Sequence, residues 1–193
     1  MSGLGDTMLR KILLHAMSGT VVAAGTLFAA TAAIAGNCEL IDAAYAKLES
    51  VPYRQTSHSV GEGPRGEINE TAQDIFTGDA LYKLETDGWH KSEKSGEELK
   101  SYLHHRPLAD DISCELTGTD TFAGEPVNIV ATSGAPLIAG TATVVVDTKL
   151  WISQRSGLPL KSELKFSSTS ARGSIALDTT YTFEFDNVQA PAP

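Results

Sequence analysis

Three glycines are the first candidates for chemistry in this sequence. Gly61, Gly63 and Gly66 have the spacing of the dinucleotide-binding pattern G-x-G-x-x-G. That pattern needs a helix directly after it, because the N-terminus of the helix holds the pyrophosphate. Pro64 and a strand-like run stand there instead. We therefore expect a hairpin turn at 61–66 and no nucleotide cofactor.

Histidines and paired acids are the other reactive groups. His104 and His105 are adjacent at the end of an expected helix and point to different sides, so they do not converge with His90 on a metal ion. The acid pairs Glu97-Glu98 and Asp110-Asp111 diverge for the same reason, and neither forms a general acid and base by itself. The sequence also has no G-x-S-x-G nucleophile elbow. We predict neither a catalytic centre nor a metal site, and the protein is not expected to be an enzyme.

The net charge restricts the partners. The formal charge of the 193-residue chain is −9 at pH 7. Nucleic acids and anionic membrane surfaces attract clusters of Lys and Arg and repel carboxylates. We therefore expect no nucleic-acid partner, and expect an apolar, cationic or protein ligand.

The first 35 residues have the pattern of a secretory signal peptide. Arg10 and Lys11 precede residues 12–35, which contain no Asp, Glu, Lys or Arg and end in Ala33-Ile34-Ala35. A basic start, an apolar middle and small residues at the last and third-last positions are typical of signal-peptidase substrates. We predict cleavage before Gly36 and a periplasmic location. The alternative is an uncleaved membrane anchor, since about 20 apolar residues can cross a bilayer as a helix.

Cys38 and Cys114 are the two cysteines of the chain. In an exported protein an even pair of cysteines is typical of a disulfide. A redox role is not indicated, since the sequence has no C-x-x-C pair. We predict a disulfide that joins the first helix to the middle of the chain.

Two amphipathic helices are predicted after the cleavage site. Asn37 is a helix N-cap type, and apolar residues recur at helical spacing for about 13 residues before Pro52 ends the pattern; they are Leu40, Ile41, Ala44, Tyr45 and Leu48. A second helix is expected over 95–105, where Leu99, Tyr102 and Leu103 share a face and Pro107 follows.

The rest of the chain has the residue patterns that are typical of β-strands. A polar run at 53–60, rich in Ser and Thr, predicts an edge strand. Further strands are expected at 67–76, 80–86, 89–92, 114–120, 127–133, 141–153, 160–168 and 174–186. Tyr181, Phe183 and Phe185 point to one side of the last strand, and acids and threonines point to the other. Twelve residues span about 40 Å, so this strand must curve to stay within one domain.

These elements predict an α+β fold. We expect a strongly curved antiparallel sheet of about 8–10 strands, a half-barrel, covered by two amphipathic helices. The single domain would occupy 36–188 after a cleaved signal peptide at 1–35, and 189–193 would form a flexible tail.

Three segments of the C-terminal third carry a family resemblance. They are LWIS at 150–153, SGLPLKSEL at 156–164 and YTFEFDNV at 181–188. Together they resemble the closing hairpins of the periplasmic lipoprotein-carrier superfamily. The resemblance implies a half-barrel closed by helices, with an apolar cavity for acyl chains or a lipidated partner. No residue matches a ligand-contacting motif of that superfamily.

The sequence thus predicts an exported, non-catalytic protein that binds a hydrophobic ligand such as a lipid, an acyl chain or a lipidated protein. The candidate residues for the cavity and its lid come from both helices and the last strand; they are Tyr45, Leu48, Leu99, Tyr102, Leu103, Tyr181, Phe183 and Phe185. The alternative is an envelope sensor or interaction module with a filled core, no lipid cargo and a protein partner in the envelope.

Overall fold

The computed structural model describes residues 26–93, 112–134, 136–139, 142–171 and 173–191. The chain divides into two compact units, Met1–Ala33 and Ile34–Pro193. All the described strands lie in the second unit, so the fold below is that of the second unit. No helix in the described ranges has the length and hydrophobicity that crossing a bilayer requires.

The helix α1 spans Thr26–Leu48 and therefore begins eleven residues before the predicted N-cap at Asn37. Alanine is the strongest helix former, and the alanine-rich run before Asn37 extends the helix towards the N-terminus. Its buried side is formed by Ile41, Ala44, Tyr45 and Leu48, as the helical spacing predicts, whereas Leu40 is exposed. The helix ends before Pro52, and the Ser50 hydroxyl donates to the Lys47 carbonyl at 2.7 Å.

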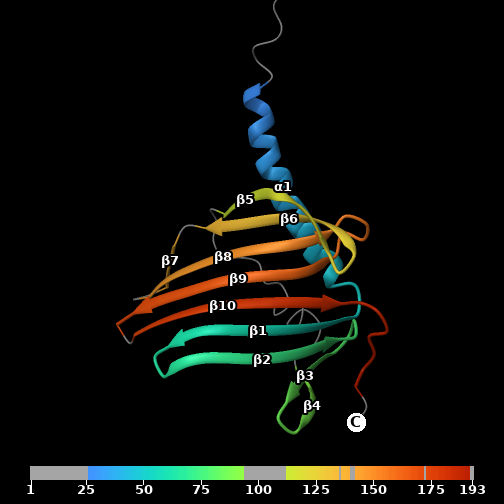
Figure 1. Ribbon diagram of the computed structural model, residues 1–193, viewed down its shortest axis with the longest axis vertical. Coiled ribbons are helices and arrows are strands. Elements are labelled where there is room, and N and C mark those ends of the chain that lie inside the picture. Colours follow the sequence, from blue (N-terminus) through green and yellow to red (C-terminus); the bar gives the residue numbers. More distant parts are fainter. Residues whose placement is uncertain (1–25, 94–111, 135, 140–141, 172, 192–193) are drawn as a thin grey trace, which may run out of the picture. The chain divides into compact units, whose positions relative to one another are not determined.

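Ten strands form one antiparallel sheet (Figure 1). Their order across the sheet is β4-β3-β2-β1-β10-β9-β8-β6-β5, and β7 pairs with β8. The strands are β1 (Tyr53–Gly63), β2 (Gly66–Phe76), β3 (Leu81–Glu85), β4 (Gly88–Lys91), β5 (Ile112–Phe122), β6 (Glu125–Gly134), β7 (Leu137–Ala139), β8 (Ala142–Ser153), β9 (Pro159–Ser170) and β10 (Gly173–Glu184).

The prediction that 53–60 is an edge strand was wrong. β1 pairs with β2 on one side and with β10 on the other, so it lies inside the sheet. Its polar side chains are accommodated because some of them form hydrogen bonds with neighbouring strands, as between the Ser59 and Thr179 hydroxyls at 2.9 Å. The β1–β10 pair also joins the N-terminal strands to the C-terminal strands.

The predicted turn at 61–66 is shorter than expected. β1 continues to Gly63 and β2 begins at Gly66, which leaves Pro64 and Arg65 as the turn. Gly61 therefore lies within a strand. A Cβ atom at this position would overlap the backbone carbonyl oxygen of Ala176 on β10, so the close approach of the two strands requires glycine.

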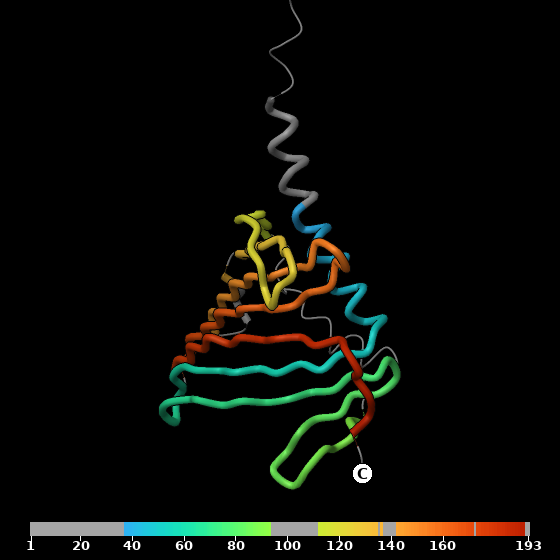
Figure 2. Tube along the Cα trace, turned by 45° about the vertical axis from the view of Figure 1, so that its right-hand side comes forward, coloured from blue at the N-terminus to red at the C-terminus, as the bar shows by residue number. Residues whose placement is uncertain are grey.

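The sheet curves along its long strands (Figure 2). β8, β9 and β10 each have twelve residues, and β-bulges interrupt the register between Leu116 and Gly118 and between Trp151 and Ile152. Bulges increase the local twist and bend the strand that contains them. The curved antiparallel sheet confirms the predicted half-barrel. One helix lies among the described residues, and the helix predicted over 95–105 falls outside them.

The main core lies between the C-terminal half of α1 and the sheet. It contains buried residues of the helix and of seven strands: Ile41, Ala44, Tyr45, Leu48, Tyr53, Phe76, Leu81, Cys114, Val130, Leu150, Ile152 and Phe183. The predicted disulfide is confirmed, since Cys38 of α1 is bonded to Cys114 of β5. It fixes the helix to the strand at one end of the sheet.

Candidate functional site

The face of the sheet towards α1 is the candidate site, and we call it the inner face. Tyr181 and Phe183 of β10 pack in the α1 core, so every second residue of β10 from Ile175 to Phe183 lies on this face. The register then places residues of the neighbouring strands on the same face, since directly paired residues point to the same side of a sheet.

Where α1 covers the inner face, the space is filled with side chains. Tyr53 packs against Phe76 and Phe183, with ring centroids 5.4 and 6.0 Å apart. Burial, and to a smaller extent the nearby Tyr181, raise the pKa of Tyr45 to about 12, although a hydrogen bond with Ser162 acts in the opposite direction. This part of the inner face is a packed core.

Beyond the part that α1 residues cover lies a row of apolar side chains. Leu177 of β10 pairs with Phe166 of β9, which pairs with Val146 of β8; on the other side Leu177 pairs with Gly61, which pairs with Ile68 of β2. We call Ile68, Leu177, Phe166 and Val146 the apolar row. All four are half-buried, whereas Phe183, six residues along β10 from Leu177, is buried. The apolar row is therefore hydrophobic inner surface that the core does not use.

Hydroxyl groups lie between the core and the apolar row. Thr179 pairs with Leu164, which pairs with Thr148, and Thr148 pairs with Thr132. The Thr132 hydroxyl is buried and has no hydrogen-bond partner among the described residues. Buried polar atoms normally have a partner, so this part of the inner face has unused hydrogen-bonding capacity.

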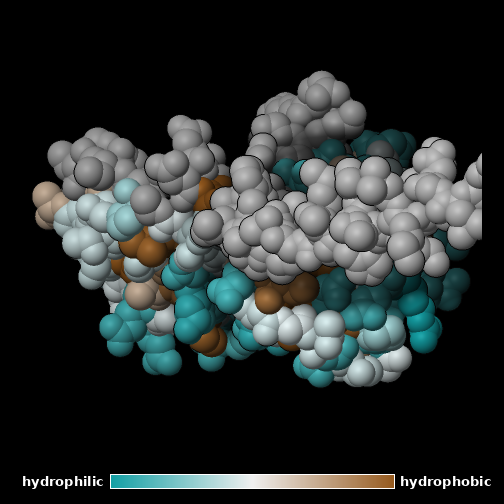
Figure 3. Space-filling model, turned by 90° about the horizontal axis from the view of Figure 1, so that it is seen from above, coloured by the Kyte–Doolittle hydropathy of each residue, from teal (hydrophilic) through white to brown (hydrophobic). Residues whose placement is uncertain are grey.

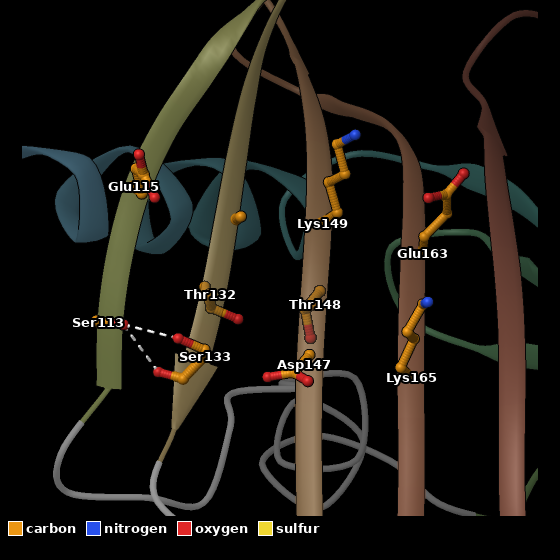
Figure 4. A pocket seen from close by; sticks show the side chains of 10 residues that line it. Ser113, Glu115, Thr132, Ser133, Asp147, Thr148, Lys149, Glu163 and Lys165 are labelled. Carbon is orange, nitrogen blue, oxygen red and sulfur yellow. Dashed lines mark hydrogen bonds between the residues drawn. The ribbon is translucent and has the colours of Figure 1, made fainter.

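The opposite face of the sheet carries charges. A groove of about 400 Å³ crosses β5, β6, β8 and β9 on the side away from α1, which lies behind the strands in Figure 4. The charged groups that line it are Glu115, Asp147, Lys149, Glu163 and Lys165. Asp147 is paired with Lys165, and Lys149 with Glu163, in the strand register. The groove therefore carries three carboxylates and two ammonium groups, and four of these charges form two register pairs of opposite sign.

Hydrophobic residues reach the surface in small patches. In the coloured part of Figure 3 these patches lie among hydrophilic side chains. The exposed large hydrophobic residues are scattered over α1, β1, β3 and β5; they are Leu40, Val60, Leu84 and Leu116. Scattered apolar residues of this kind are normal for a protein surface and indicate no binding site.

Three residues of types that can bind a metal ion lie together in the β3–β4 hairpin. Ligand atoms of Glu85, Asp87 and His90 lie within 4.8 Å of one another, and all three residues are exposed. The His90 Nε2 is 2.7 Å from the Asp87 carboxylate, and this hydrogen bond lowers the pKa of Asp87. The sequence analysis singled out His90 but missed the two acids, which the hairpin turn brings to it. Because the three side chains are solvated, their proximity alone does not define a metal centre.

The predicted cavity residues that the structure describes occupy two environments. Tyr45, Leu48 and Phe183 are buried in the core, and Tyr181 and Phe185 are half-buried and packed against it. The residues predicted for the second helix, Leu99, Tyr102 and Leu103, lie outside the described residues. The sequence analysis missed the apolar row, although the alternation that marked Phe183 also places Leu177 on the same side of β10.

Comparison with known proteins gives similarity in structure only. No family model matches the sequence, and no curated protein matches it. The crystal structure of the Mycobacterium tuberculosis lipoprotein LppX superposes with a TM-score of 0.50 at 10% identity, covering 81% of this chain and 99% of LppX.

Two further structures superpose more weakly. MucB in complex with MucA gives a TM-score of 0.39 at 14% identity, over 81% of this chain and 57% of that one. A putative outer membrane lipoprotein-sorting protein domain from Vibrio parahaemolyticus gives 0.23 at 9% identity, over 81% and 94%. The comparison with LppX therefore shows a shared fold, and the two weaker superpositions add nothing to it.

Proposed function

We propose that this protein is an exported, non-catalytic binding protein of the bacterial envelope that holds a hydrophobic ligand against the inner face of its sheet. The ligand is an acyl chain, a lipid or a lipidated partner. The apolar row is the observation that carries the proposal, because these four side chains remain half-buried beside a core that is otherwise packed. The fold that the chain shares with a lipoprotein, LppX, supports the proposal, as do the signal-peptide pattern of residues 1–35 and the disulfide.

The dimensions of the row suit a hydrocarbon chain. Ile68 on β2 and Val146 on β8 are separated by four strand spacings, which amount to about 19 Å. Each methylene group of a ligand that leaves water for such a surface contributes roughly 0.8 kcal/mol. The binding energy therefore comes from the apolar surface that the ligand buries, and it grows with the length of the hydrocarbon chain. Binding of this kind needs no reactive group on the protein.

A matched pair of variants on β10 tests the proposal. Leu177→Asn places a polar side chain in the apolar row, whereas Asp178→Asn places the same side chain one residue further along, on the outer face. Removing one fully buried leucine from a ligand contact costs about 1.5–3 kcal/mol, or roughly a 10- to 100-fold loss of affinity. We expect this loss for Leu177→Asn only, in titrations of delipidated protein with a fluorescent fatty acid. Equal affinities in the two variants would show that the ligand does not lie on this row.

An envelope interaction module is the second candidate. The packed core beneath α1 favours the interaction module, since side chains fill that part of the inner face. Native mass spectrometry of protein secreted with its own N-terminal segment separates the two candidates. A co-purifying lipid mass supports the binding protein, and repeated preparations without any bound apolar species support the interaction module.

A further inference from the structure

Charged side chains are unevenly distributed over the inner face. The strands β1, β10, β9 and β8 form the middle of this face, and none of the described residues that they place on it is charged. The outer face of the same strands carries acids and bases, such as Asp178, Lys165 and Asp147, which are paired across β10, β9 and β8. The middle of the inner face is therefore uncharged, although the strands that form it are rich in charged residues.

The charges of the inner face lie on its β2–β3 side, beside β1 (Figure 1). Glu70 and Asp74 of β2 pair with residues of β1 that share the inner face with Gly61. In β3, Lys83 pairs with Asp74, and Glu85 lies two residues further along on the same face. Three carboxylates and one ammonium group are therefore found on this side, where the apolar row ends on β2.

Glu70 is the inner-face charge that lies closest to the apolar row. It is two residues from Ile68 on the same face of β2, or about 7 Å along the strand, whereas Asp74 is six residues from Ile68, or about 20 Å. Interactions between exposed charges are screened beyond about 8 Å at physiological ionic strength. A ligand group at the β2 end of the row therefore experiences mainly the charge of Glu70.

The Glu70 side chain is accessible to a ligand. It is exposed, and it forms no ion pair with another described residue. Ser59, its direct neighbour on β1, shares a hydrogen bond with the Thr179 hydroxyl at 2.9 Å. The apolar row thus ends on β2 beside a carboxylate that no described side chain neutralises.

This arrangement orients an amphiphilic ligand. A hydrocarbon chain avoids charged groups, so its free end belongs over the uncharged strands β9 and β8, and its polar end belongs beside β2. The Glu70 carboxylate repels a carboxylate or phosphate headgroup and attracts an ammonium group.

We propose that the ligand of the inner face has a cationic, ammonium-bearing headgroup, which lies beside Glu70, and a hydrocarbon chain that runs along the apolar row towards Val146. This inference rests on the proposed function and adds the charge and the orientation of the ligand to it.

A structural role is the alternative explanation for an acid at this position. β3 pairs with β2 only from Asp74 to Phe76, so Glu70 lies in a part of β2 that has no described partner strand on its second edge. Charges at a free edge discourage pairing with other chains. That role does not depend on the face that the acid occupies, and it predicts no effect on the affinity for a ligand.

Three detergents with the same twelve-carbon chain test the charge of the headgroup. They are dodecyltrimethylammonium, which is cationic, dodecyldimethylamine oxide, which is uncharged at neutral pH, and dodecanoate, which is anionic. Each is titrated below its critical micelle concentration into the delipidated protein by calorimetry. In about 20 mM salt we expect the cation to bind about fivefold more tightly than dodecanoate, and we expect the difference to shrink in about 300 mM salt.

Glu70→Lys and Glu67→Lys form a matched pair of variants. Both glutamates are exposed on the same free part of β2, and both substitutions change the net charge equally, but Glu67 pairs with Glu62 on the outer face. Glu70→Lys should reverse the preference, so that dodecanoate binds more tightly than the cation, and should change the affinity for the amine oxide less than twofold. Glu67→Lys should leave the cation preferred.

The other outcomes are equally decisive. Equal affinities of the unmodified protein for the three detergents, or the same change in both variants, would overturn the assigned headgroup charge and leave the proposed function intact. Failure of all three detergents to bind the unmodified protein would overturn the proposed function itself. If Glu70→Lys does not fold, Glu70→Gln is compared with Glu67→Gln, and an undiminished preference for the cation in Glu70→Gln would overturn the assignment.

Discussion

Opening the Cys38–Cys114 disulfide should destabilise the protein by an amount that follows from its place in the chain. The two cysteines are 76 residues apart, and the bond closes a loop that includes β1 to β4. On the chain-entropy model, a loop of this length restricts the unfolded chain by about 4.5 kcal/mol at 25 °C. Loss of the bond leaves the packing of α1 in place, so the effect acts mainly on the unfolded state.

Urea unfolding with and without reductant measures this effect. For an m-value of about 2 kcal/mol per molar urea, the midpoint should fall by about 2 M when the disulfide is reduced. A variant with serine at both cysteine positions should have the low midpoint and should not respond to the reductant. A midpoint that moves by less than about 0.5 M in reductant would refute the reasoning, because the loop would then not be restricting the unfolded chain.

Two further perturbations test other parts of the structure. Gly61→Ala should destabilise the protein much more than Gly63→Ala in thermal unfolding. The new Cβ meets the rigid Ala176 backbone in the first variant and the flexible end of the Ile68 side chain in the second. Equal effects would contradict the close approach of β1 and β10. The pKa of Tyr45 rises from 10.0 to about 12 on folding. Its contribution to the free energy of unfolding is therefore complete below pH 10 and lost between pH 10 and 12, and urea titrations should show a loss of roughly 1 kcal/mol at pH 11. Tyr45→Phe should remove this part of the pH dependence, and the same decline in that variant would place its origin elsewhere.

Local patterns in the sequence were sufficient for most of the fold. Period-two alternation located the strands because each residue of a strand faces one side of the sheet, and helical spacing located the buried side of α1. The start of α1 was misplaced because Asn37 matches an N-cap by type, while the alanines before it continue the helix. The position of β1 was misjudged because a polar strand at the edge of a sheet and one inside it look alike until the partners are known.

The candidate site depends on information that the sequence does not carry locally. The apolar row brings together single residues of four strands, and each residue appears in its own strand as one member of an ordinary alternation. Gln55 looks like a surface residue in a polar run, and only the packing of β1 inside the sheet reveals that it is buried. Register between distant strands, rather than composition, defines both places.

The pairing of β1 with β10 has a consequence for how the protein is made. Residues that meet there are far apart in the chain, as with Arg54 and Glu184, which form an ion pair across a separation of 130 residues. Such long-range contacts form slowly, and here they form only when β10 has been synthesised. A nascent polypeptide that stops before β10 would consist of two unconnected sheet fragments, each with an open edge that invites aggregation.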